Sequence, residues 1–219
     1  EVGKGLGLQY ALERAKGDLI LYFDVDNRIP STTIERLVEW MERGYDGAQV
    51  KILSKNALQN RLTFMQHVEF MIYPTIYCGG KHRLGLSSGI GGTGVMVKKT
   101  ALDAVGGFRN LLVEDFDLQL RLTLRGFKLC YAEDAIVYDE KVTSWRNLLK
   151  QRARWVAGHI QLWRTYSLKE KLNLIKHPID FMYLYSPICT LALMTSFILS
   201  SIHFLLPQIG FFSLPWIFW

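Results

Sequence analysis

The distribution of charge along the chain constrains its fold more than any other feature of the sequence. All 26 lysines and arginines lie at or before Lys176, and the last 43 residues carry one charged side chain, Asp180. The run 181–202 has 22 residues and no charge, and about 20 apolar residues suffice for a helix to cross a bilayer. We therefore expect a membrane helix over 181–202, with a buried core helix as the alternative. A second apolar stretch, 209–219, is too short to cross a bilayer as a helix.

The segment that precedes this run is strongly basic. Between 141 and 176, Glu170 is the only acid among nine lysines and arginines. The positive-inside bias places such a flank in the cytoplasm. We expect a soluble domain over 1–140, a basic and aromatic interfacial region over 141–177, and a membrane region over 178–219. Because no targeting segment precedes the first residue, an internal fragment of a longer protein is expected.

The composition excludes several other classes. With 13 % aromatic residues and ordinary charge density, the chain can bury a sizeable core, which excludes disorder. Three scattered cysteines, Cys78, Cys130 and Cys189, fit neither a disulfide framework nor a CxxC metal site, and they indicate a reducing compartment.

The soluble part alternates helical and strand patterns. Apolar periodicity predicts helices, and short apolar runs predict strands. Thr32 and Glu35 have the spacing of a capping box at the start of the second helix. The alternation is typical of an α/β domain with a mostly parallel sheet. The predicted helices are about 5–16, 34–44, 58–78 (on the domain or the bilayer surface), 114–125 and 143–166, and the predicted strands are 19–23, 48–53, 95–97 and 128–138.

Two aspartates, Asp24 and Asp26, follow the first predicted strand directly. In open α/β sheets, ligands bind outside the carboxyl ends of the strands. Paired carboxylates there can hold a hard divalent cation, Mg²⁺ or Mn²⁺, whose other ligands are waters and substrate phosphates. A solvated turn is the alternative, because aspartate favours turns.

Two further groups carry candidate chemistry. Glu114 and Asp115 begin a predicted helix, where the helix dipole alone favours acids. Gln151, Arg154 and Trp155 stand at i, i+3 and i+4, and therefore on one helix face. An amide, a guanidinium and an indole suit a pyrophosphate and a sugar ring. The alternative is a helix that lies on anionic lipid, to which the nearby Arg152 is suited.

The stretch 89–94 matches GxGxxG, but it precedes a predicted strand, whereas a dinucleotide fingerprint must follow a strand and open a helix. We therefore exclude a dinucleotide site. A flexible glycine loop still allows the backbone to approach a bound sugar.

The order of these motifs, DxD at 24–26, a glycine-rich loop, Glu-Asp at 114–115 and QxxRW at 151–155, resembles the membrane-bound family 2 glycosyltransferases. These include cellulose, chitin, hyaluronan and poly-N-acetylglucosamine synthases. The resemblance implies a GT-A fold and an inverting transfer of sugar from a nucleotide diphosphate sugar to a growing polysaccharide, at the cytoplasmic face of the plasma membrane. Transfer of one sugar to a lipid is the alternative, and a non-catalytic membrane scaffold is a remote one.

The resemblance also implies roles for single residues. Mg²⁺ or Mn²⁺ is the expected cofactor, and the expected partners are the donor, the acceptor and membrane lipids, with no nucleic acid. A family strand whose aspartate contacts the nucleobase has no counterpart before the first residue, so we expect an incomplete nucleotide pocket. The implied roles are Asp115 as general base with Glu114 beside it, Asp26 and Asp24 at the metal, Asp24, Lys4, Gln151 and Arg154 at the donor, and Trp155, Thr93 and Gly94 at the acceptor.

Overall fold

This computed structural model describes residues 3–205, without the side chains of 186–194, 197–198 and 203–205. A four-stranded sheet forms the centre of the described part. The strand order is β1-β3-β2-β4. β3 is antiparallel to both β1 and β2, and β2 is parallel to β4. The prediction of a mostly parallel sheet is therefore confirmed only in part: β1, β2 and β4 run in the same direction, but the reversed β3 makes the sheet mixed. The strands are β1 (Leu19–Tyr22), β2 (Gly47–Ser54), β3 (Val95–Lys98) and β4 (Leu129–Asp139).

The error comes from β3, whose short apolar run carries no information about its direction. The strand is buried because it lies between two others, and a buried central strand has the same apolar pattern in either orientation. β1, predicted as a buried strand, lies at the edge of the sheet, and only Tyr22 in it is fully buried.

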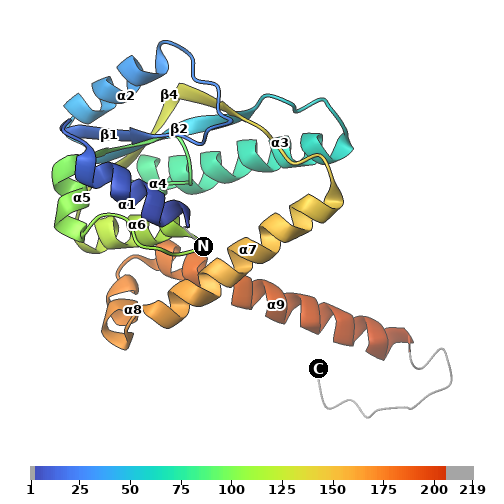
Figure 1. Cartoon of the computed structure of the whole chain (residues 1–219). Helices are drawn as coiled ribbons and strands as arrows, with labels where there is room; N and C mark the ends of the chain where they lie inside the picture. Colours follow the sequence, from blue (N-terminus) through green and yellow to red (C-terminus); the bar gives the residue numbers. More distant parts are fainter. Residues whose placement is uncertain (1–2, 206–219) are drawn as a thin grey trace.

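Helices cover both faces of the sheet (Figure 1). The side chains of β3 alternate, so that Val95 and Val97 face α1, α5 and α6, whereas Met96 faces α2. The short helices α4, α5 and α8 were not predicted, because seven residues or fewer show no clear apolar period. The helices are α1 (Lys4–Arg14), α2 (Thr33–Glu42), α3 (Arg61–Pro74), α4 (Gly80–Arg83), α5 (Lys99–Val105), α6 (Glu114–Leu124), α7 (Trp145–Thr165), α8 (Leu168–Leu174) and α9 (Pro178–Leu205), with a π-helical turn, η1 (Thr75–Gly79).

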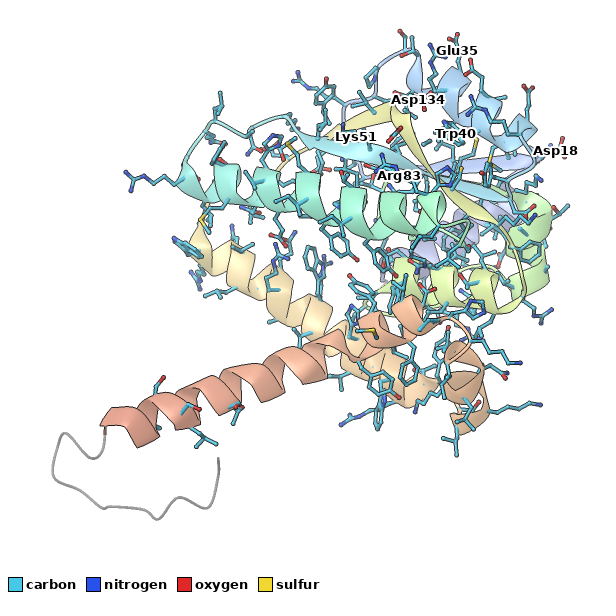
Figure 2. All side chains as sticks on the ribbon, turned by 180° about the vertical axis from the view of Figure 1, so that it is seen from behind. Asp18, Glu35, Trp40, Lys51, Arg83 and Asp134 are labelled. Carbon is cyan, nitrogen blue, oxygen red and sulfur yellow. The ribbon has the colours of Figure 1, made fainter. Side chains whose placement is uncertain are left out.

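The start of α2 differs from the prediction. Thr32 has helical backbone angles, and its side chain makes no capping hydrogen bond, so the predicted capping box with Glu35 is absent. Instead, the Thr33 hydroxyl donates to the Ile136 carbonyl oxygen at 2.7 Å. α2 is also joined to β4 by the Trp40 indole, which donates to Asp134 at 2.6 Å; both side chains lie near the top of Figure 2.

Helix α9 contains the run 181–202 and projects away from the sheet in both views (Figures 1 and 2). In the described part of the chain, no helix is long and apolar enough to cross a bilayer, so the predicted membrane helix is not confirmed. The stretch 209–219 lies outside the described residues. The thiols of Cys78 and Cys130 are free and buried, and the Cys189 side chain is not among those described.

The first turns of α9 pack into the folded domain. Leu184 is buried against Phe116 and Leu120 of α6 and Leu162 of α7. Asp180, the one charged residue after Lys176, is buried and lies 2.5 Å from the Lys81 ammonium group. The beginning of the predicted membrane region is therefore a structural part of the domain.

Candidate active site

The loop after β1 holds the first candidate residue, Asp24, against a lysine from α1. The Lys4 ammonium group lies 2.6 Å from Asp24 Oδ1. The Asp24 backbone N–H donates to Thr93 Oγ1 at 2.9 Å. The far end of the loop is fixed by two backbone hydrogen bonds of 2.9 Å between Arg28 and Tyr138 of β4. Both ends of the loop are thus tied to neighbouring segments.

Asp26 is the more open of the two aspartates. Its side chain is exposed, and its carboxylate receives one long hydrogen bond, 3.5 Å, from Asn27. It forms no ion pair with any described residue. The described residues contain no group of three or more acidic, histidine or cysteine side chains placed to hold a metal. Asp26 and Asp24 fit a hard cation that takes most of its ligands from phosphates and water.

The glycine loop approaches the same lysine. The Gly92 carbonyl oxygen accepts a hydrogen bond from Lys4 Nζ at 2.5 Å. A Cβ atom on Gly92 would lie 3.4 Å from that nitrogen and 3.6 Å from Asp115 Oδ2. Gly94 has φ +66°, and a Cβ there would lie 2.2 Å from Val50 Cγ2, so only glycine fits.

Glu114 and Asp115 complete the cluster from the N-terminus of α6. Glu114 Oε1 lies 3.6 Å from Lys4 Nζ, and the Phe116 backbone N–H donates to Asp115 Oδ1 at 2.9 Å. Burial, together with the charge of Asp115, raises the Glu114 pKa to about 7, although Lys4 opposes the shift. Burial also raises the pKa of Asp115, against the Phe116 hydrogen bond and Lys4. Such shifts are typical of catalytic carboxylates.

Residues far apart in the sequence therefore converge on Lys4. Strand-end placement predicts that Asp24 and Asp26 lie at one site with Asp115 and the Gln151–Trp155 face, despite about 90 and about 125 residues of sequence between them. Of these, the structure brings Asp24 and Asp115 to the same lysine. Lys4 contacts Asp24, Glu114 and Gly92, and Gly92 lies beside Asp115. A lysine among three carboxylates, with a glycine backbone alongside, can bind a phosphate donor and accept a proton.

The Gln151–Trp155 face does not join this cluster in the described residues. No hydrogen bond or ion pair links Gln151, Arg154 or Trp155 to the carboxylates among them, and Arg154 is exposed. Arg152 makes a bidentate ion pair with Glu69 of α3, at 2.7 and 2.5 Å. Arg152 therefore joins α7 to α3, whereas the lipid alternative gave it no partner within the protein.

The same helix is nevertheless anchored next to Glu114 and Asp115. A Cβ atom on Gly158 would lie 2.6 Å from Val113, the residue before Glu114. The Leu112 backbone N–H donates to Gln161 Oε1 at 3.0 Å. Trp155 lies about one helical turn before Gly158, so α7 carries it close to the start of α6.

Comparisons with known proteins identify the family of the chain. The family model described as "Glycosyl transferase family group 2" matches residues 19–219. The chain belongs to glycosyl transferase family group 2. A probable glycosyltransferase of Sulfolobus acidocaldarius is 30% identical over 93% of this chain and 45% of its own length. A beta-monoglucosyldiacylglycerol synthase of Synechocystis is 32% identical over 75% of this chain and 34% of its own length.

Further matches include mannosyltransferases. Glucomannan 4-beta-mannosyltransferase 7 of Arabidopsis thaliana is 30% identical over 67% of this chain and 27% of its own length. A mannosyltransferase of Pyrobaculum calidifontis, solved in complex with GDP-Man and Mn²⁺, superposes with a TM-score of 0.58 over 94% of this chain and 61% of its own, at 14% identity. The likeness confirms a GT-A-like fold. The family 2 chain spans less than half the length of these curated relatives.

Two buried glutamines position the glycine loop of this family 2 chain, and neither was predicted. Gln49 of β2 is 2% exposed; it accepts from the Gly91 N–H at 2.6 Å and donates to the Thr93 carbonyl oxygen at 3.0 Å. Gln119 of α6 is 1% exposed and accepts from the Ile90 N–H at 3.0 Å. The only sequence signal for either was a polar residue between two apolar neighbours, Ala48 and Val50 for Gln49, and Leu118 and Leu120 for Gln119.

Tyr22, at the end of β1, is a third missed residue. Its hydroxyl is buried and has no hydrogen-bond partner within the described part of the chain. Burial raises the Tyr22 pKa, and the charges of Asp115, Glu114 and Asp24 raise it further. The phenol therefore stays neutral and lies within electrostatic range of all three carboxylates.

Proposed function

We propose that the protein transfers a sugar, with inversion, from a nucleotide diphosphate sugar to an acceptor hydroxyl. The observation that carries the proposal is the convergence of Asp24, Glu114 and Asp115 on Lys4 beside the glycine loop. Family membership and the GT-A-like fold support the same reaction class.

In this proposal Asp115 is the general base. Its carboxylate is oriented by the Phe116 N–H, and it takes the proton from the acceptor hydroxyl as that oxygen attacks the anomeric carbon. The bond to the donor diphosphate breaks on the opposite face, so a single displacement inverts the centre. With a pKa of about 7, Glu114 holds a proton for part of the time near neutral pH. This proton reduces repulsion between the neighbouring carboxylates.

The diphosphate leaving group needs positive charge. We assign Mg²⁺ or Mn²⁺ to Asp26 and Asp24; when bound, the ion neutralises charge that develops on the diphosphate. Lys4 approaches the same group from α1, beside Asp24. Arg154 and Gln151 are assigned to the diphosphate as well, once donor binding draws the exposed arginine inward. The structural neighbour from Pyrobaculum calidifontis, solved with Mn²⁺, supports this assignment.

We place the acceptor, a growing polysaccharide, at Trp155 and at Thr93 and Gly94 of the glycine loop. The glucomannan mannosyltransferases among the relatives support a polymer. A lipid acceptor is the second candidate, which the beta-monoglucosyldiacylglycerol synthases favour. We further propose that the protein is a membrane protein whose catalytic domain faces the cytoplasm. The uncharged run 181–202, the basic flank before it and the exposed side chains of Trp145 and Leu149 on α7 support this location.

The test compares Asp115→Asn with a matched control, Asp18→Asn, an exposed aspartate just before β1 that lies at the right edge of Figure 2. Removal of a general base lowers transfer by roughly 10²–10⁴-fold, whereas the control should retain full activity. Binding of the donor should survive Asp115→Asn. The assay offers labelled nucleotide sugars with polysaccharide or diacylglycerol acceptors. Asp115→Asn activity within a few-fold of Asp18→Asn would exclude the assigned base, and the acceptor that is labelled decides between the two candidates.

The metal is tested separately. Transfer should stop in excess chelator and return when Mg²⁺ or Mn²⁺ is restored, because both ions bind carboxylate and phosphate oxygens. Asp26→Asn should raise the metal concentration needed for half-maximal activity. Full turnover in chelator would mean that the Asp24–Asp26 loop is a solvated turn.

A further inference from the structure

A cavity of about 450 Å³ lies near the C-terminal end of α6. Its walls come from α5, the loop after it, α6, α8 and the segment just before α9. Arg125 in its wall lies ten residues after Asp115, or about 15 Å along a helix axis, so the cavity is separate from the carboxylate cluster. Its charged lining consists of Arg109, Arg121, Arg125, Lys176 and Glu170.

One side of the cavity is rigid. Arg121 is buried and lies 2.7 Å from Asp117 Oδ2, and it donates from Nη1 to the carbonyl oxygens of Val105 and Gly107 at 2.7 and 2.8 Å. Arg109 shares the same aspartate at 3.4 Å. A single carboxylate, Asp117, thus serves two guanidinium groups.

The rest of the lining leaves positive charge uncompensated. The Glu170 carboxylate accepts from the Ser167 N–H and hydroxyl at 2.8 and 2.7 Å, so it caps its own helix. Arg125 and Lys176 form no ion pair with any residue in the described part. Four cations therefore face the cavity with two carboxylates, Asp117 and Glu170, close to them. An excess of two positive charges around a concave site favours an anion with several oxygens.

We propose that this cavity binds a phosphate group, independently of the reaction proposed above. Arginine forks match phosphate oxygens, and lysine adds a mobile point charge. The volume of about 450 Å³ exceeds what one phosphate needs, so an esterified phosphate also fits.

The surroundings favour a lipid headgroup as the source of the phosphate. Leu168 and Leu172 of α8 and Ile175, the residue that follows α8, stand at i, i+4 and i+7 and are 71%, 55% and 54% exposed. Glu170 and Asn173, on another face of the same helix, line the cavity. A phosphate bound there would place its acyl chains beside an exposed apolar helix face, whereas a free phosphate would leave that face unused.

The test uses Arg125→Gln/Lys176→Gln, which removes the two unpaired charges from exposed side chains and leaves the buried Arg121 intact. The control, Lys128→Gln/Lys169→Gln, removes two exposed charges outside the cavity. Binding of inorganic phosphate is measured by calorimetry at constant ionic strength. Binding to phosphatidylcholine vesicles is measured by flotation, with and without phosphatidic acid. Thermal unfolding verifies that each variant is folded. If the double variant does not fold, Arg125→Gln and Lys176→Gln are measured as single substitutions.

The cavity variant should bind the phosphate probe roughly tenfold or more weakly than the control, since two charge-assisted hydrogen bonds are lost. A loss seen only with phosphatidic acid vesicles supports the site with a lipid as its ligand. A loss with inorganic phosphate supports the site with a free phosphate. Equal binding by the two double variants, or no binding of either probe by the unsubstituted protein, overturns the proposal.

Discussion

Replacement of Lys81 by methionine is expected to destabilise the fold strongly, because Lys81 forms a buried ion pair with Asp180. Lys81 Nζ and Asp180 Oδ1 are 2.5 Å apart, and the two side chains are 2% and 3% exposed. Asp180 also accepts from Tyr77 Oη at 2.9 Å and from Gln119 Nε2 at 2.6 Å. One buried carboxylate thus joins α9 to η1, α4 and α6.

The magnitude follows from burial. Lys81→Met leaves Asp180 charged and buried with two neutral donors, and loss of one partner of a buried ion pair costs about 3–5 kcal/mol. For a domain of this size, each kcal/mol lowers Tm by about 2–4 °C, so a fall of roughly 6–20 °C is expected. Asp180→Ala should cost more, because it leaves Lys81, Tyr77 and Gln119 without their shared acceptor.

Thermal and urea unfolding, followed by circular dichroism, measure these losses. The matched control is Arg83→Met, since Arg83 lies two residues away and pairs at 3.1 Å with Glu133 in a contact whose side chains are 64% and 61% exposed (Figure 2). Such a pair contributes about 0–1 kcal/mol. The double variant Lys81→Met/Asp180→Leu should be more stable than Asp180→Ala, because apolar residues of similar volume can replace the buried ion pair, although Tyr77 and Gln119 still lose their acceptor. Equal Tm values for Lys81→Met and Arg83→Met would refute the reasoning.

Three further predictions concern the site. Gly94→Ala should destabilise the chain by roughly 1–3 kcal/mol from backbone strain alone, and more than Gly44→Ala in urea unfolding, since both have positive φ but only Gly94 meets a side chain. Because folding raises the Glu114 pKa from 4.5 to about 7, the folded state binds more protons between these pH values. The free energy of unfolding should therefore fall as pH rises through this window, and Glu114→Gln should flatten the fall. Trp155→Ala should lower transfer by roughly ten- to hundredfold if the indole stacks on the acceptor sugar; donor hydrolysis, measured alongside, should fall less, and equal loss in both would indicate a purely structural tryptophan.

The sequence predicts the long elements well, because their periods repeat several times. The helix expected at 114–125 is α6 (Glu114–Leu124), and the strand expected at 48–53 is β2 (Gly47–Ser54). The direction of β3 and the edge position of β1 could not be predicted, since both depend on which strands pair, and pairing leaves no trace in a four-residue apolar run. The helix over 143–166 was predicted, but the ion pair of its Arg152 with Glu69 was not. Glu69 lies on α3, and the sequence does not show which helices pack together.

The sequence predicts a candidate site residue where a charged side chain stands next to the end of a strand or the start of a helix, as Asp24 and Asp115 do. It does not predict one where a single polar residue stands between two apolar neighbours, as Gln49 and Gln119 do. In a strand, such a residue has the pattern of a solvent-facing position. Gln49 and Gln119 are buried instead, and each makes hydrogen bonds to the glycine loop, one from the sheet and the other from α6.

The two amides also account for the loop itself. A buried amide without partners would cost about 1–3 kcal/mol, so Gln49 favours a fold in which the backbone of 91–93 covers it. Gln119 bonds Ile90 through its oxygen and Asp180 through its nitrogen. The loop that lies beside Asp115 is therefore linked through a single side chain to the first turn of α9. Displacement of α9 would disturb the Gln119 hydrogen bonds, and with them the loop backbone beside Asp115.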